Sequence, residues 1–220
     1  MSRAVIWDCD GVLVDSEPHS VVSWVAVLGR FGSEVTASDV EGCVGLGYQD
    51  TYARLAAYPA GRTIPGPDAL WPLLLEAIGE SFGPYLPPFA DALETIEAVA
   101  ALGIAQGVAT SSNRSRVDLA LERSGLAEWF GTVVAGDQVD HPKPWPDVYL
   151  RAAELIGAKP SECVAVEDTS HGCKAAVAAG MPVIGVVRVE LERAPMVKAG
   201  SALVIDRVEP SMVLDLLGIT

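Results

Sequence analysis

Six short apolar runs, separated by segments with helical periodicity, constrain the fold of this chain more than any other feature. The runs lie at Ala4–Trp7, Ile104–Ala109, Thr132–Ala135, Cys163–Val166, Val183–Val187 and Ala202–Ile205. They lack the polar–apolar alternation of strands that face water on one side, so we expect strands buried on both faces. Because strands that alternate with helices are joined by crossover connections, the sequence predicts an α/β protein with a parallel sheet.

The segment of residues 17–85 has a different pattern from the rest of the chain. It contains helical periodicity at Val21–Leu28, Asp50–Ala57 and Ala69–Ile78 but no strand pattern, and glycine and proline cluster at its end, from Gly83 to Pro88. We therefore predict an all-helical domain at 17–85, inserted into an α/β core made of 1–16 and 86–220.

Composition limits the classes of partner. The chain has 220 residues, half of them hydrophobic and a fifth charged, which is typical of a packed globular protein. Its formal net charge is −14, and so acidic a surface repels nucleic acid and anionic membranes. A phosphorylated substrate would then have to be attracted by a local cation. We expect a monomer or weak dimer with no nucleic-acid or membrane partner.

The cysteines and the start of the chain indicate a cytoplasmic protein. The four cysteines (Cys9, Cys43, Cys163 and Cys173) form no CxxC pair and no zinc-like spacing with the histidines, so we expect buried thiols in a reducing compartment. The apolar run after Met1 is too short for a signal peptide, and no apolar stretch approaches the roughly 18 residues of a membrane span.

The first chemical signal is the acidic pair Asp8 and Asp10, directly after the first predicted strand. A turn at Gly11 can bring both carboxylates to the end of that strand, where one can attack phosphorus while the other transfers protons. A solvated acidic turn is the alternative. A calcium loop is excluded because the glycine comes too early and His19 stands where the bidentate glutamate should be.

Three further signals each follow another predicted strand. Thr110 and Ser111 offer hydroxyl groups near the start of a helix, Lys143 lies in a proline-rich loop, and Glu167 and Asp168 are adjacent acids. Taken singly, they could be a helix cap, a solvated lysine and a capping acid. The carboxyl ends of parallel strands meet at one edge of a sheet, and ligands bind there. We therefore predict one site with a nucleophile, a proton shuttle, a divalent-cation site and phosphate-binding groups.

These four motifs, in this order, resemble those of the haloacid dehalogenase superfamily. The chain is most similar to phosphatases of the β-phosphoglucomutase type, and the resemblance covers essentially all of it. It implies a Rossmann-like parallel sheet core with an inserted all-helical cap domain. It also implies a Mg²⁺-dependent phosphatase that hydrolyses a small phosphorylated metabolite, such as a sugar phosphate, through an aspartyl-phosphate intermediate.

The resemblance also implies a role for each motif residue. Asp8 is the expected nucleophile and Asp10 the expected general acid and base. The expected phosphate-binding residues are Thr110, Ser111 and Lys143, and the expected Mg²⁺ ligands are Asp8, the carbonyl of Asp10, Glu167 and Asp168. An oxygen-only ligand set favours Mg²⁺ over zinc.

Substrate specificity is expected to lie in the cap. By resemblance, the loop from Gly45 to Asp50 dips over the site, and we expect Gly45 and Tyr48 to contact the substrate, with His19 reaching it from the hinge. A sugar-phosphate mutase is the alternative, but mutases of this family use a cap arginine near the position of Tyr48. Arg54 could take that place. A non-catalytic protein on the same fold is less consistent, because all four motifs are intact.

Overall fold

The computed structural model describes residues 3–57 and 64–219. Its centre is a six-stranded sheet in the order β3-β2-β1-β4-β5-β6, in which every neighbouring pair is parallel. The strands are β1 Ala4–Trp7, β2 Ala105–Ala109, β3 Thr132–Val134, β4 Cys163–Glu167, β5 Val183–Val186 and β6 Leu203–Ile205. The predicted α/β fold with a parallel sheet is confirmed, and each predicted strand lies within two residues of its observed bounds.

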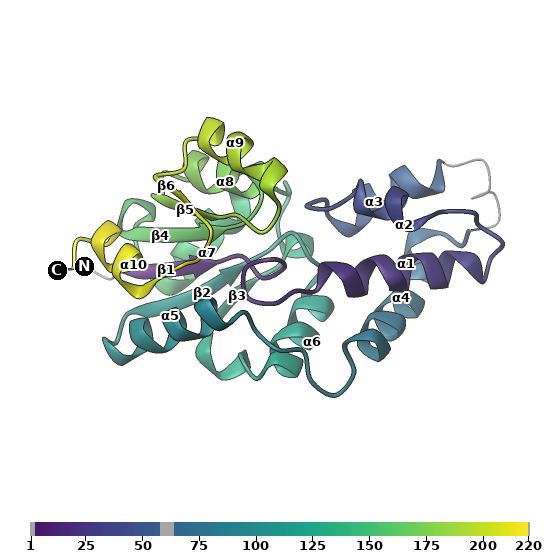
Figure 1. The fold of residues 1–220 in the computed structure, drawn as a ribbon, viewed down its shortest axis with the longest axis horizontal. Helices are drawn as coiled ribbons and strands as arrows, with labels where there is room; N and C mark the ends of the chain where they lie inside the picture. The colour runs from purple at the N-terminus through teal and green to yellow at the C-terminus, as the bar shows by residue number, and fades with distance from the viewer. Residues whose placement is uncertain (1–2, 58–63, 220) are drawn as a thin grey trace.

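Helices cover both faces of the sheet (Figure 1). Alternate residues of β1 face opposite sides: Val5 and Trp7 pack with α5 and α10, while Ala4 and Ile6 pack with α7 and α8. All four side chains are fully buried, which explains why this strand is apolar at every position. The core helices are α5 Ala90–Ala101, α6 Arg114–Ser124, α7 Asp147–Ile156, α8 Ser170–Ala178, α9 Glu190–Ala199 and α10 Pro210–Leu216.

Four helices form a separate lobe beyond the carboxyl ends of the strands (Figure 1). They are α1 Glu17–Gly29, α2 Ala37–Glu41, α3 Tyr48–Ala56 and α4 Pro67–Phe82. Pro67 occupies the first turn of α4, and Gly83 follows its last residue with φ of 64°. The lobe is all-helical in its described residues, as the sequence predicts, although the exact boundaries at 17–85 stay a prediction.

The two segments that join the lobe to the core run side by side. Val14 forms an antiparallel bridge with Pro88, and the backbone N–H of Phe89 donates to the carbonyl of Leu13 at 2.9 Å. Both segments lie next to the turn that carries Asp8 and Asp10. Movement of the lobe would therefore act directly on the surroundings of these two acids.

The sequence did not predict three of the helices. Helix α2 has only five residues, α9 contains Pro195, and α10 has seven residues near the end of the chain. Their periodicity is too short or too interrupted to be recognised without the tertiary packing. No helix in the described ranges is both long and apolar enough to cross a membrane.

Candidate active site

A tight turn after β1 places Asp8 and Asp10. The backbone N–H of Asp8 still pairs with β4 through the carbonyl of Val166 at 2.9 Å, so the ladder extends up to this acid. Gly11 then adopts φ of 77°, and a Cβ built there would lie 1.9 Å from Oδ2 of Asp168. Only glycine fits this position without strain and collision. The short distance from this built Cβ to Asp168 also shows that the turn and the Asp168 side chain are in close contact.

Asp8, Glu167 and Asp168 form a buried cluster of three carboxyl groups at the ends of β1 and β4. One oxygen from each can be chosen so that all three lie within 4.8 Å of one another. Oδ1 of Asp168 is buried and has no hydrogen-bond partner among the described residues. Three carboxyl groups this close, one of which has an unpaired oxygen, fit the ligand set of a hard divalent cation.

Lys143 joins two members of this cluster. Its Nζ donates to Oδ1 of Asp8 at 2.8 Å, to Oε1 of Glu167 at 2.5 Å and to the carbonyl of Ala109 at 3.0 Å. These three bonds use all the donors of the ammonium group, whose side chain is only 3% exposed. The loop before α7 thus fixes one positive charge against Asp8.

The single charge of Lys143 does not offset the burial of Asp8 and Asp168, whose pKa values are both raised. Burial, opposed by Lys143 and reinforced by Glu167 and Asp10, raises the pKa of Asp8 to about 7. Burial and the neighbouring Asp8 and Glu167 raise the pKa of Asp168 well above its ordinary value. Burial would lower the pKa of Lys143, but Asp8 and Glu167 outweigh it and raise that pKa. A bound cation would favour the ionised forms of Asp8 and Asp168.

Glu167 makes the most contacts within the cluster. Its Oε1 also accepts from the hydroxyl of Tyr149 at 2.6 Å, and its Oε2 accepts from the backbone N–H groups of Asp168 and Thr169. The side chain is completely buried. Glu167 therefore holds both Lys143 and the start of α8 in place, whatever else it binds.

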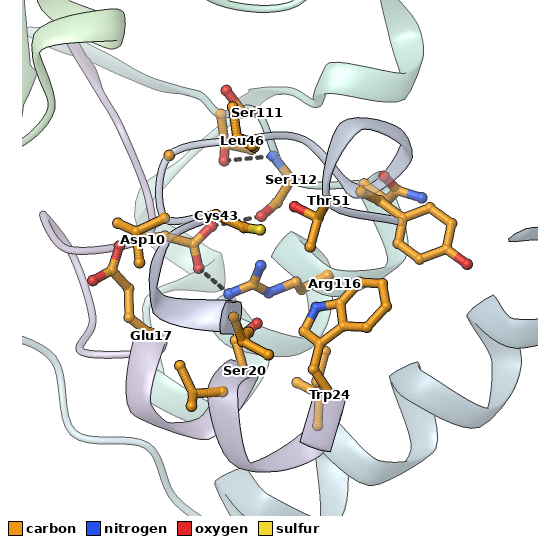
Figure 2. A pocket seen from close by; sticks show the side chains of 18 of the residues that line it. Asp10, Glu17, Ser20, Trp24, Cys43, Leu46, Thr51, Ser111, Ser112 and Arg116 are labelled. Atoms are coloured by element: carbon orange, nitrogen blue, oxygen red, sulfur yellow. Dashed lines mark hydrogen bonds and ion pairs between the residues drawn. The ribbon is translucent and has the colours of Figure 1, made fainter. Parts of the chain in front are cut away.

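Asp10 lies on the other side of the turn and has different neighbours. Its Oδ2 accepts from the hydroxyl of Ser112 at 2.6 Å, and its Oδ1 accepts from Nη2 of Arg116 at 2.9 Å (Figure 2). The hydroxyl of Ser16 also donates to Oδ1 of Asp10. Burial would raise the pKa of Asp10, but the charge of Arg116 and the two hydroxyl groups outweigh it and lower that pKa. Without a bound cation or substrate, the pKa of Asp8 is thus raised and that of Asp10 lowered, which is the reverse of what a nucleophile and a general acid need. A cation at the acidic cluster would lower the pKa of Asp8, and a substrate group that draws Arg116 away from Asp10 would raise the pKa of Asp10.

Thr110 and Ser111 follow β2 at the same edge of the sheet. Oγ1 of Thr110 accepts from the backbone N–H of Ser112 at 3.1 Å, which shapes the turn before α6. Both residues line the same cavity as Asp8, Lys143 and Asp168. The structure thus brings the four predicted motifs together at one place.

The cavity lies between these core residues and the helical lobe, and it encloses about 850 Å³ of space that is partly open to solvent. Gly45 and Tyr48 line it, as predicted for the cap loop. The lobe contributes mainly apolar side chains to the cavity, among them Val21, Trp24, Val40, Leu46, Trp71 and Leu74. The ring of Tyr48 packs against the rings of Trp24 and Trp71, and its hydroxyl donates to the carbonyl of Pro67 at 2.6 Å.

His19 does not line this cavity. Its Nδ1 lies 2.8 Å from Oγ of Ser81, and its ring packs edge-on against Phe82, both on α4. Helix α1 turns Glu17, Ser20, Val21 and Trp24 toward the cavity, and His19 falls on another face. The structure gives no support for the expected substrate contact of His19.

Arg116 is the site residue that sequence reasoning missed. It stands in the first turn of α6 and lines the cavity. The sequence did contain a signal for Arg116, because the first turn of α6 carries two arginines, Arg114 and Arg116, and no acidic residue. Positive charge is unfavourable at a helix N-terminus, so such a residue often serves another group.

Comparison with known proteins agrees with this geometry. A family model described as haloacid dehalogenase-like hydrolase matches residues 5–186. Fructose-1-phosphate phosphatase YqaB from Escherichia coli is 31% identical over 83% of this chain and 95% of its own length.

Two further proteins show how far the similarity extends. Protein SUPPRESSOR OF QUENCHING 1 from Arabidopsis thaliana is 33% identical over 97% of this chain, which spans 20% of that protein. The crystal structure of a haloacid dehalogenase family hydrolase from Deinococcus radiodurans, with bound phosphate and sodium, superimposes with a TM-score of 0.71. It is 28% identical, and the match covers 99% of this chain and 96% of the other.

Proposed function

Because this chain belongs to the haloacid dehalogenase-like hydrolase family, we propose that it is a phosphatase acting through an aspartyl-phosphate on Asp8. The observation that carries the proposal is the pairing of Asp8 with Lys143 inside a cluster that also contains Asp168. A carboxylate so placed can attack a phosphoryl group only if positive charge offsets the repulsion between two anions. Lys143 provides one such charge.

The reaction has two steps. An oxygen of Asp8 forms a bond to phosphorus while the ester bond breaks, and Asp10 gives its proton to the leaving oxygen. Asp10 then takes a proton from water, which attacks phosphorus, releases inorganic phosphate and restores the carboxylate of Asp8. Thr110, Ser111 and Lys143 hold the phosphoryl oxygens during both steps, and Lys143 does so by exchanging one of its three present acceptors for a phosphoryl oxygen.

Mg²⁺ is the cation that we propose for the acidic cluster. Its ligands would be Asp8, the carbonyl of Asp10, Glu167 and Asp168, and when bound it supplies charge neutralisation at the phosphoryl group. The unpaired Oδ1 of Asp168 supports this assignment. The all-oxygen donor set favours Mg²⁺ over softer metals.

The substrate is proposed to be a small phosphorylated metabolite, related in class to the sugar phosphate in the name of the Escherichia coli relative. A mutase needs a second cation, in the cap, to hold the second phosphate of its substrate. The described residues of the lobe contribute no lysine or arginine to the cavity lining, and the guanidinium of Arg54 lies beside Gly42. The phosphatase is therefore favoured, and product analysis with and without a bisphosphate activator separates the two.

Replacing Asp10 with asparagine is expected to reduce hydrolysis of an alkyl phosphate by about 10²–10⁴-fold, the usual contribution of general acid–base catalysis. The loss should be smaller for nitrophenyl phosphate, whose leaving group needs no proton. Phosphate release with Mg²⁺ measures both, and Asp15→Asn, an exposed neighbour, is the matched control. Equal losses on the two substrates would contradict the proton-transfer role.

A cytoplasmic location, the absence of nucleic-acid and membrane partners, and a monomer or weak dimer stay predictions of the sequence. The four cysteines are all buried free thiols, which is consistent with a reducing compartment.

A further inference from the structure

Arg116 is a basic residue of the cavity, and the proposed mechanism gives it no role. Among described residues that line the cavity, Lys143 and Arg116 are the basic ones, and Lys143 lies against Asp8 and is already assigned to the phosphoryl group. Arg116 is bound only in part. Its Nη2 donates to Asp10 and Ser16, while Nε is buried without a hydrogen-bond partner in the part of the chain that the structure describes. An unpaired buried donor costs free energy, so an acceptor on a ligand would be stabilising here.

The position of Arg116 specifies where on the substrate that acceptor must be. Arg116 lies on core helix α6, and its side chain points to Asp10, close to the first turn of the lobe helix α1 (Figure 2). In the proposed reaction Asp10 meets the leaving oxygen. A group bound by Arg116 therefore belongs to the leaving group and lies a few bonds from the ester oxygen.

The charges around Arg116 select a carboxylate over a second phosphate. Asp10 and Glu17 line the same part of the cavity, and the side chain of Arg116 is only 17% exposed. A dianionic phosphate would face two acids with a single positive charge to hold it. A carboxylate carries one negative charge and matches the planar fork of one guanidinium.

We propose that Arg116 binds a carboxylate of the substrate, which is then a phosphomonoester of a short hydroxy acid or sugar acid. This inference rests on the proposed phosphatase function and narrows its substrate class. It also gives the core, in addition to the cap, a part in specificity. The remaining lining from the lobe is mainly apolar and would surround the carbon skeleton.

The test compares two ligands that differ in one group. Phosphoglycolate carries a carboxylate where the monophosphate of ethylene glycol carries a hydroxymethyl group. In an Asp8→Asn background, where turnover is blocked, the rise in Tm that each ligand causes with Mg²⁺ measures binding, and kcat/KM with Asp8 present measures hydrolysis. We expect the wild-type protein to prefer phosphoglycolate by about 10- to 100-fold, the range for hydrogen bonds to a charged group.

Three variants identify the source of that preference. Arg116→Gln should bring the ratio close to one, chiefly through KM, and Arg116→Lys should restore part of it by returning the charge without the fork. Arg114→Gln should keep the full ratio, because Arg114 is exposed and paired with Asp118. Arg116 also contacts Asp10, so its replacement can lower turnover of both ligands. The readout is therefore the ratio of the two kcat/KM values, because a loss common to both ligands cancels in it.

The outcomes separate this inference from the proposed function. No preference in the wild-type protein, or an unchanged preference in Arg116→Gln, would overturn the role of Arg116. Hydrolysis of nitrophenyl phosphate without carboxylate preference would leave the phosphatase proposal standing. Failure to hydrolyse any of the three esters would refute the phosphatase, while a preference in Tm that Arg116→Gln removes would still support the carboxylate site.

Discussion

Asp8→Asn is expected to lower phosphate release by at least about 10⁴-fold, the scale seen when a covalent nucleophile is removed. The amide keeps the shape of the side chain, and its oxygen can still accept a hydrogen bond from Lys143. In the wild-type protein Nζ of Lys143 lies 2.8 Å from Oδ1 of Asp8. What the variant loses is the anionic oxygen that would form the bond to phosphorus. Steady-state phosphate release with Mg²⁺ measures the effect.

The Tm of Asp8→Asn shows separately whether the variant has a folding defect. Because burial raises the pKa of Asp8 from 3.8 to about 7, its ionised form destabilises the folded state increasingly as pH rises through that range. Without divalent cations at pH above that pKa, Asp8→Asn should therefore have a Tm at least equal to that of the wild-type protein. A low Tm together with low activity would point to misfolding, and near wild-type activity would contradict the assignment of Asp8.

Asp168→Asn is expected to abolish the response to divalent cations. Chelation should stop turnover of the wild-type protein, and Mg²⁺ at about 100 times its Kd should restore turnover and stabilise the fold by about 2.7 kcal/mol. For a chain of this size that is a rise in Tm of about 5–10 °C. The variant should show little rise and lose about 10³-fold in activity, since the carboxylate with the unpaired Oδ1 is gone.

The matched control for this variant is Asp206→Asn, which removes a surface carboxylate that pairs with Arg193. It should keep both the cation-dependent rise in Tm and the activity. An equal rise in Tm in Asp168→Asn and in the wild-type protein would show that the cation binds elsewhere.

The sequence predicts the sheet well because the central strands β1, β4 and β5 are buried on both faces and therefore almost entirely apolar. Asp8, Thr110 and Asp168 come directly after strands, and Lys143 lies in the loop between β3 and α7, so the predicted order of strand and motif also places these residues at one edge. Helix α9 was not recognised, because Pro195 interrupts its pattern.

The cap side of the site was harder to predict, because it depends on how one helix faces another. His19 is close to the first motif in sequence, yet one helical face carries Ser20 and Trp24 into the cavity while His19 meets α4. Arg116 is the reverse case. In sequence it is one of three arginines on helix α6, and only the packing of α6 against the turn after β1 shows that it lies beside Asp10.

The most direct test of the account is to trap the covalent intermediate. The protein is mixed with substrate and Mg²⁺, quenched rapidly in acid and treated with borohydride, which reduces an acyl phosphate to an alcohol. Peptide mass spectrometry should then find homoserine at position 8 of the wild-type protein and no reduced residue in Asp8→Asn. Reduction at another carboxylate, or none in a wild-type sample quenched during rapid turnover, would contradict phosphoryl transfer through Asp8.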